Sequence, residues 1–335
     1  MTMLPFLLLL LTLVHILSST VSAFSVGKSN VHHRFHQSLP TQSSLSNDGS
    51  IFGVSISSAD NTVSHKTALY AVTPTPEAVE LKNSLLASIQ DLRTKQARDG
   101  EISVDFGVKG GELNATTRAP QKLDFYSISN DVGEAADKVL DLCDRLGAVS
   151  PVDNPTRFLG NRQNGTMAPL EGPWKLLFST AADASFSKNS TRGDAKAQNI
   201  VNGVRGTITN VIDFANLANG AEPFLKQLRV VIGAKAVNAK RVELNFRYAK
   251  AVFTRFLFLK VRWSLWIPVP DVFITRCIVI VSTILRLGRG GFKAPPTPYF
   301  DVLYLDDELR IHKTGQGNIF VQAREWWDQA KPLLE

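Results

Sequence analysis

The chain has 335 residues, of which 44% are hydrophobic and 20% are charged, and its formal net charge is +7 at pH 7. This is the composition of an ordinary globular protein. Two cysteines without spacing partners exclude a disulfide framework and a Cys-based zinc site, and too few histidines follow residue 71 for a His-based metal site. The basic residues form no cluster of the kind that binds nucleic acid, so we expect no metal, no cofactor and no nucleic-acid partner.

An apolar run at residues 4–17 opens the chain and is too short to span a bilayer comfortably. Small residues follow it, which is typical of a signal peptide, and we expect residues 1–23 to be removed by cleavage after Ala23. No lysine or arginine precedes the run, although signal peptides usually begin with positive charge. An uncleaved membrane anchor therefore remains the alternative.

Residues 24–71 have the composition of an organelle transit peptide, because they hold eleven serines and only two acidic residues. A signal peptide followed by a transit peptide is a targeting sequence that acts in two steps. The junction, with Phe24 first after the cleavage point, resembles the bipartite plastid presequence of algae whose plastids lie inside extra membranes. We therefore expect import into the plastid through the secretory pathway, with a mature chain that begins near Val72.

Two segments have the periodicity of helices. The first spans residues 74–97 and begins with Pro76, a residue that favours a helix start. A Gly-rich polar linker leads to the second, over residues 129–147, which Ser129 can cap and Gly147 ends. The apolar positions are Val79, Leu81, Leu85, Leu86, Ile89 and Leu92 in the first helix, and Cys143 lies among those of the second, where we expect it to pack in the core.

From Gly172 onward the hydrophobic period changes from 3.6 to 2, which predicts strands. Most of these strands have no helix between them, so we expect antiparallel pairing. Eight such strands close naturally into a small barrel, which leaves no exposed edge and is wide enough for one small ligand. We predict an α+β, mainly β fold, an antiparallel barrel of about eight strands preceded by one or two N-terminal helices. The predicted strands are 174–180, 204–214, 225–233, 240–248, 255–267, 300–305, 309–313 and 318–324.

Residues 268–299 break this alternation, with prolines at both ends and a dense β-branched run between them. The run is too short for a spanning helix, and Arg276 interrupts it. One interpretation is a buried strand or helix within the barrel wall. The other is a lid or a membrane-contacting insertion, in which Arg286 and Arg289 lie at the level of anionic headgroups.

Residues 302–324 combine three consecutive acids with Arg310 and His312, a set that suits either the catalytic end of a hydrolase or the polar half of a β-hairpin. Strand alternation turns Arg310 and His312 away from Leu309 and Ile311, as a hairpin requires. We favour the hairpin, in which the three acids occupy a turn and are either solvated or paired with Arg310. The glycines expected in its tight loop are Gly315 and Gly317.

This hairpin closely resembles the C-terminal motif of the plastid lipid-associated proteins, also called plastid fibrillins or plastoglobulins. That family has an acidic Y-L-D-x-D/E-L-R-I stretch, a glycine-containing turn and an F-V-x-x-R ending. The start of the first strand, with Gly172 and Trp174, resembles the family's L-x-G-x-W opening. The matching hairpin residues are Tyr304, Leu305, Asp306, Glu308, Leu309, Arg310, Ile311, Gly315, Gly317, Phe320, Val321 and Arg324.

The resemblance implies a lipocalin-like barrel and assigns structural roles to the motif residues. Trp174 would plug one barrel end, with Arg324 or Arg310 packed across its indole in a cation–π contact. The motif residues expected to be structural are Gly172, Trp174, Asp306, Arg310, Gly315, Gly317 and Arg324. The expected divisions are a signal peptide (1–23), a transit peptide (24–71), an N-terminal helix and linker (72–128), the fibrillin domain (129–327) with its insertion at 268–299, and a C-terminal tail (328–335).

The resemblance also implies a protein without catalytic residues, because family members bind or coat lipids and isoprenoids on plastoglobules, on thylakoids or in the stroma. Our leading hypothesis is a barrel that sequesters a plastid lipid (a quinone, a carotenoid or a fatty acid) by removing its apolar surface from water. The candidate lining residues are Leu177, Val242, Leu244, Phe246, Leu259, Val261 and Trp263.

Two other functions remain open. A structural coat protein would dock peripherally on lipid particles or membranes through its basic charge and outward aromatics, for which Phe256, Phe258 and Trp266 are candidates. A cavity-based enzyme acting on lipids or carotenoids would have only the acids at 306–308 and His312 available. These four residues lie near a turn, so the enzyme is the weakest of the three hypotheses.

Overall fold

The computed structural model describes residues 73–100, 122–161, 167–182, 195–217, 220–255, 261–268 and 297–334. The predicted signal and transit peptides and most of the 268–299 insertion lie outside these ranges, so the two interpretations of the insertion stay predictions. Within the described ranges, no helix is both long and apolar enough to cross a membrane.

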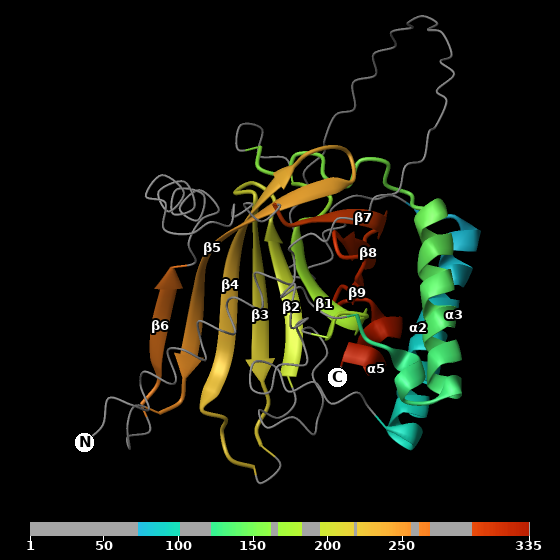
Figure 1. Cartoon of the computed structure of the whole chain (residues 1–335). Helices are drawn as coiled ribbons and strands as arrows, with labels where there is room; N and C mark the ends of the chain where they lie inside the picture. The colour runs from blue at the N-terminus through green and yellow to red at the C-terminus, as the bar shows by residue number, and fades with distance from the viewer. Residues whose placement is uncertain are drawn as a thin grey trace, which may run out of the picture. The chain divides into compact units, whose positions relative to one another are not determined.

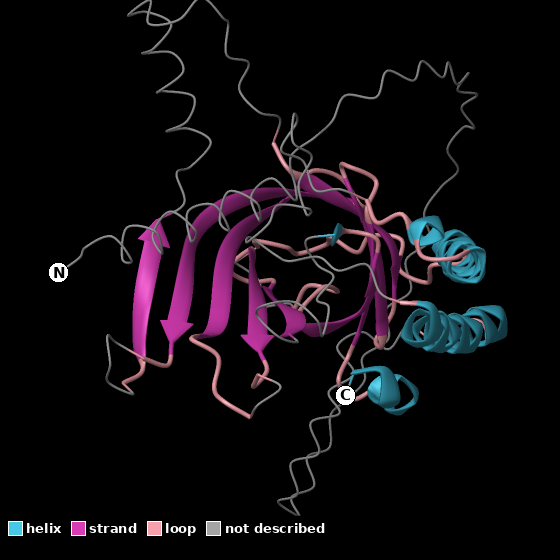
Figure 2. Ribbon diagram, turned by 60° about the horizontal axis from the view of Figure 1, so that its bottom comes forward, coloured by secondary structure: helices cyan, strands magenta, loops and turns pink. Residues whose placement is uncertain are grey.

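The described residues include nine strands in one antiparallel sheet (Figure 1). Their order is β4-β3-β2-β1-β9-β8-β7-β5-β6, and β4 also pairs with β5, so eight strands close into a ring. Figure 2 shows how the sheet curves round to make this ring. The predicted mainly β, barrel-like fold with N-terminal helices is thereby confirmed. The strands are β1 (Gly172–Ser179), β2 (Ala195–Asn202), β3 (Thr207–Phe214), β4 (Leu225–Ala236), β5 (Arg241–Phe253), β6 (Trp263–Pro268), β7 (Tyr299–Leu305), β8 (Leu309–Thr314) and β9 (Ile319–Ala323).

Two strands differ from the prediction. The sequence does not predict β2, because its inward positions Ala195, Ala197 and Asn199 are small or polar and make the hydrophobic alternation weak. Within the predicted strand at 255–267, of which residues 256–260 lie outside the described ranges, the structure has β6, which pairs with the second half of β5 and lies outside the ring. The ring closes instead through the first residues of β5, which pair with β7.

Both predicted helices form. Helix α2 (Pro76–Asp99) and helix α3 (Asn130–Ala148) begin at capping hydroxyls, those of Thr75 and Ser129, each of which accepts a backbone N–H at 3.2 Å. These caps satisfy amide groups that have no partner within the helix. Helix α3 continues one residue beyond Gly147, where the sequence predicts its end.

The helices bury their apolar stripes against one outer flank of the ring, in a contact that we call the outer cluster (Figure 1). Ile311 of β8 and Val321 of β9 point outward into it and are completely buried. Cys143 is buried there as predicted, and burial raises the pKa of its thiol to about 12. The predicted stripe is wrong at Val79, which is 42% exposed.

The predicted C-terminal tail extends the outer cluster. It forms the 3-10 turn η3 (Asp328–Ala330) and the short helix α5 (Lys331–Leu334), and Leu333 is buried against the helices. Arg93 of α2 donates to the Leu333 carbonyl at 2.7 Å, which ties this end of the chain to α2. A further 3-10 turn, η1 (Phe125–Ser127), precedes α3.

A second apolar cluster, which we call the interior cluster, lies inside the ring and draws on six of its strands. The inward side chains of β4 and β5 supply most of it, and they are almost completely buried. Strands β8 and β9 contribute nothing to it, because their inward positions are mostly polar. Its larger members include Trp174, Ile208, Leu228, Val230, Ile232, Val242, Leu244, Phe246, Phe253 and Phe300.

Candidate functional site

Strand alternation places a polar patch inside the ring. Arg310 and His312 lie on the face of β8 opposite Leu309 and Ile311, as the sequence predicts. Because Leu309 and Ile311 belong to the outer cluster, Arg310 and His312 point into the ring. Gln322 of β9 lies directly opposite Arg310 and shares its face. Together with Asn199 of β2, these three residues form what we call the interior polar patch.

Arg310 is the centre of this patch and is only 1% exposed. Its Nε donates to the Gln322 side-chain oxygen at 2.9 Å, and its Nη2 donates to the Asn199 side-chain oxygen at 2.8 Å. Its Nη1 has no hydrogen-bond partner among the described residues. Burial, together with repulsion from Arg324, lowers the pKa of Arg310 to about 9, so the side chain still carries its charge at neutral pH.

His312 lies between two aromatic rings inside the ring of strands. Its ring centre is 4.8 Å from that of Phe300 and 5.0 Å from that of Phe320, and the Phe320 contact is a parallel stack. Its Nδ1 is buried without a hydrogen-bond partner in the described part of the chain. Burial, and then the charge of Arg310, hold the pKa of His312 well below its usual value, so the imidazole is neutral.

His312→Phe, which keeps an aromatic ring against Phe320, is expected to remove a pH dependence of stability. In the folded protein the pKa of His312 is well below 6.5. In the unfolded chain the imidazole is protonated as the pH falls through about 6.5. The stability linked to the neutral imidazole is therefore complete above that pH and is lost as the pH falls below it. Between about pH 7.5 and about pH 5.5, this group should lower the free energy of unfolding by about 1 kcal/mol. Urea titrations should show this loss in the wild type in excess of any in the variant, and equal losses would contradict it.

Trp174 of β1 stands at one end of the interior, completely buried beside two arginines. The guanidinium carbon of Arg324 lies 3.6 Å from the centre of the indole ring, and that of Arg310 lies 5.2 Å from it. Arg324 therefore makes the closer of the two cation–π contacts that the sequence left open. The indole Nε1 donates to the carbonyl of Leu170 at 2.9 Å, which sets the orientation of the ring.

Gly172 is required by the same stack. Its φ of 95° lies in the left-handed region, and an added Cβ would lie 2.6 Å from Nη1 of Arg324. Arg324 cannot easily move away, because it donates to the carbonyl oxygens of Glu171 and Pro173, the latter at 3.1 Å. The motif Gly-x-Trp thus positions a backbone, an indole and a guanidinium as one unit.

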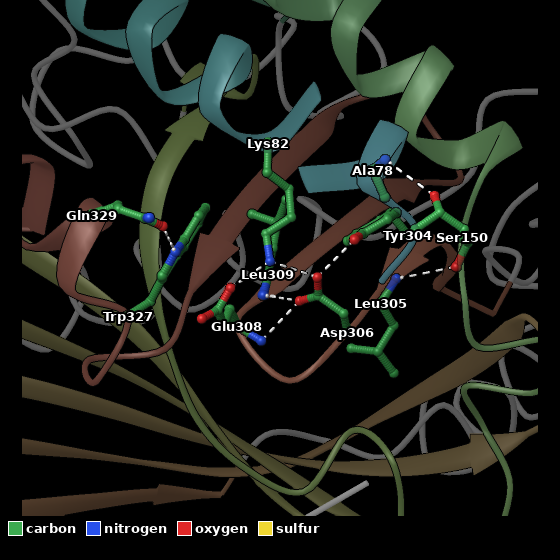
Figure 3. Close-up of polar contacts among 11 residues, drawn as sticks. Ala78, Lys82, Ser150, Tyr304, Leu305, Asp306, Glu308, Leu309, Trp327 and Gln329 are labelled. Atoms are coloured by element: carbon green, nitrogen blue, oxygen red, sulfur yellow. Dashed lines mark hydrogen bonds and ion pairs between the residues drawn. The ribbon is translucent and has the colours of Figure 1, made fainter. Parts of the chain in front are cut away.

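The acidic turn between β7 and β8 faces the helices (Figure 3). One oxygen of Asp306 accepts the backbone N–H groups of Glu308 at 2.8 Å and Leu309 at 2.6 Å. The other accepts the Tyr304 hydroxyl and the Lys82 ammonium of α2, each at 2.7 Å. Glu308 accepts from the same ammonium at 2.5 Å, so Lys82 is neutralised by two carboxylates. Burial and the neighbouring Asp306 raise the pKa of Tyr304 and keep its hydroxyl a donor.

The prediction that these acids are solvated or paired with Arg310 is wrong for Asp306, which is 5% exposed and paired with Lys82. The reason is geometric. Alternation turns Arg310 into the ring, whereas the turn carries Asp306 to the opposite side, under α2. In the hairpin loop, Gly317 adopts the expected positive φ of 85°, while Gly315 is not among the positive-φ residues and donates to the Tyr299 carbonyl at 3.1 Å.

The seven predicted lining residues do not share one surface. Val242, Leu244 and Phe246 of β5 point inward and belong to the interior cluster. Leu177 belongs to the outer cluster, because the β-bulge after Leu176 turns it toward the helices. Three remain: Trp263 packs at the edge of the interior cluster, Val261 is 51% exposed, and Leu259 lies outside the described residues.

Sequence reasoning missed the polar partners of Arg310. Gln322 occupies the inward face of β9. The sequence could have predicted this face, because Gln322 alternates with the apolar residues Val321 and Ala323. Asn199 lies on β2, which the sequence does not predict, so no local sequence pattern indicated its inward position. In the described part of the chain, no three His, Cys, Asp or Glu side chains are grouped as metal ligands.

The fold and the site define an eight-stranded antiparallel barrel, helix-covered on one flank, with a cationic polar patch in a mostly apolar interior. The PAP_fibrillin family model matches residues 132–323, more than half of the chain. The chain therefore belongs to this family, that of the plastid lipid-associated proteins or fibrillins. The family is plastid-associated, and its members are generally structural lipid-associated proteins rather than enzymes. No curated protein and no solved structure matches the chain.

Proposed function

We propose that the protein binds a plastid lipid or isoprenoid inside its barrel without transforming it, at plastoglobules or thylakoids. The observation that carries this proposal is a closed ring with an apolar inner wall and inward side chains that are only partly buried. A lipid that leaves water for such a wall gains about 0.8 kcal/mol for each buried methylene group.

The inner wall is uneven in its packing. On β4 and β5, inward residues such as Leu228, Val230 and Val242 are at most 1% exposed. On the other side of the ring, Leu176 of β1 and Phe320 of β9 also point inward, yet both keep partial exposure. Protein interiors are normally close-packed, so partly exposed inward side chains are expected where other side chains do not fill the space. This side of the interior is therefore where we place the ligand.

The chemistry of the interior supports binding rather than catalysis. General acid–base catalysis needs a positioned proton donor or acceptor with a suitable pKa. The interior polar patch offers an arginine that is charged at neutral pH and an imidazole whose pKa is held well below its usual value. Asp306, the buried acid of the motif, faces the helices, and both its oxygens already accept hydrogen bonds.

Mass spectrometry of the purified protein tests the proposal. We expect a co-purifying lipid, and after delipidation we expect an added quinone, carotenoid or fatty acid to quench tryptophan fluorescence. Ala197→Trp should reduce the bound lipid about tenfold, because it places a large ring on the partly exposed inward face of β2. Lys196→Trp, one residue away on the exposed outward face, is the matched control and should retain it. If neither lipid nor quenching is found in the wild type, the binding function is wrong.

A second candidate function, coating of lipid particles, is favoured by one outward residue. Trp266 of β6 is 57% exposed, and the Lys250 ammonium lies 5.0 Å from its ring centre. An exposed indole beside a cation suits an anionic lipid surface. Phe256 and Phe258, the other aromatics assigned to this surface, lie outside the described residues. In flotation with anionic vesicles, a coat protein floats and its Trp266→Ser variant stays below, whereas a carrier without surface affinity stays below in both forms.

A further inference from the structure

Arg310 carries a buried positive charge that no carboxylate balances among the described residues. Its hydrogen-bond partners are the amide oxygens of Gln322 and Asn199, and the charge that acts on its pKa is that of another cation, Arg324. Amide oxygens satisfy single N–H groups, but they do not compensate a full charge removed from water. The charge is therefore only partly accommodated by the protein itself.

Lys82 is a second buried cation, with a structural role, and its pairing can be compared with that of Arg310. Its ammonium is also almost completely buried, and it lies 2.7 Å from Asp306 and 2.5 Å from Glu308. Arg310 has no such pair within the described part of the chain, and it faces the ring interior rather than the helix contact. Two carboxylates neutralise Lys82, whereas Nη1 of Arg310 has no acceptor among the residues that the structure describes.

The unsatisfied side-chain nitrogens of the interior polar patch lie together on β8. Nη1 of Arg310 and Nδ1 of His312 are both buried without a hydrogen-bond partner in the described ranges, and their residues are inward neighbours on one strand. A guanidinium presents its N–H groups in a planar fork that matches a carboxylate, and a neutral imidazole can donate one further proton. On the same side of the interior, the inward residues Leu176 of β1 and Phe320 of β9 are apolar and partly exposed, so an apolar chain can lie beside the patch.

We propose that the ligand of the barrel is a long-chain carboxylate, with its head group on Arg310 and His312 and its chain along the apolar inner wall. This inference rests on the proposed lipid-binding function and specifies its ligand class. A neutral quinone or carotenoid would leave the Arg310 charge unbalanced. A diphosphate carries more negative charge than one free guanidinium can balance, and both Nη groups of Arg324 already donate to the carbonyl oxygens of Pro173 and Glu171.

The test compares head groups on one chain. Delipidated protein is titrated by calorimetry with oleate, with methyl oleate and with a neutral alkyl quinone. Because a charge-assisted hydrogen bond contributes more than a neutral one, oleate should bind about 10- to 100-fold more tightly than its ester. In Arg310→Met, oleate affinity should fall to that of the ester, while the affinity for the ester stays within about twofold. A purely structural Arg310 would instead change the binding of all three ligands together.

Two control variants separate charge from fold. Arg229→Met removes an arginine from the exposed outward face of β4 and should leave the preference for oleate intact. Arg310→Lys keeps a charge at the site and should retain part of the preference. It also serves if Arg310→Met does not fold, and the wild-type comparison of acid and ester needs no variant at all.

The outcomes distinguish this inference from the function on which it rests. Equal affinity of wild-type protein for oleate and its ester, or a preference that survives in Arg310→Met, would overturn the carboxylate assignment. If ester and quinone still bind in that case, the lipid-binding function stands with a neutral ligand. If none of the three ligands binds and no lipid co-purifies, the lipid-binding function itself fails.

Discussion

Asp306→Ala is expected to lower the free energy of unfolding by about 3–5 kcal/mol, the usual effect of removing one partner from a buried ion pair. The variant leaves the Lys82 ammonium buried with Glu308 as its single acidic partner, and that side chain is 41% exposed. It also leaves the Tyr304 hydroxyl and two backbone N–H groups without their acceptor. Equilibrium urea unfolding followed by circular dichroism measures the change.

A surface pair provides the matched control for Asp306. Glu325 accepts from Lys175 at 2.9 Å with 68% of its side chain exposed, so Glu325→Ala should change the free energy of unfolding by less than about 1 kcal/mol. Replacing both buried partners, in Lys82→Met with Asp306→Leu, should recover much of the lost stability, because no charge is then left buried alone. An Asp306→Ala effect no larger than the surface control would contradict the buried pair.

Trp174→Ala is expected to have a similar effect, about 3–5 kcal/mol, as for other large-to-small substitutions at buried aromatic positions. The indole is completely buried and supports the guanidinium of Arg324 at 3.6 Å. Its loss removes the interior packing at this end of the ring and the π face against which a buried cation rests. The hydrogen bond to the Leu170 carbonyl is lost as well. Thermal and urea unfolding should both report the change.

The same substitution at Trp326 is the control for Trp174. Arg324 also lies near the Trp326 ring, at 5.0 Å, but this indole is 40% exposed. Trp326→Ala should therefore lower the free energy of unfolding by less than about 1 kcal/mol. Equal effects of the two substitutions would mean that the Trp174 stack is not a buried unit of the barrel.

Much of the fold could be predicted because local patterns carry it. The 3.6-residue period with its capping hydroxyls determined α2 and α3, and the period of 2 determined the faces of β5, β8 and β9. The hairpin motif led to the family that the wider match then showed. Prediction failed at β2, where small and polar inward residues give no hydrophobic period to read.

The site could be predicted only in part, for a related reason. The sequence alone determined that Arg310 and His312 share a face, since residues two apart in a strand always do. It did not determine which face is inside, which partners they meet, or that Leu177 turns toward the helices after a bulge.

The tertiary structure determines the inward face, the side-chain partners and the orientation of Leu177. Asp306 meets Lys82 across 224 residues of sequence, and Arg310 meets Asn199 across 111. Periodicity orders side chains along one element, whereas partners across elements depend on ring closure and on where the helices dock. The sequence by itself therefore determined a barrel and a plastid lipid-associated family. Only the tertiary structure decided that Asp306 stabilises the helix contact and that Arg310 faces the interior with a charge left to satisfy.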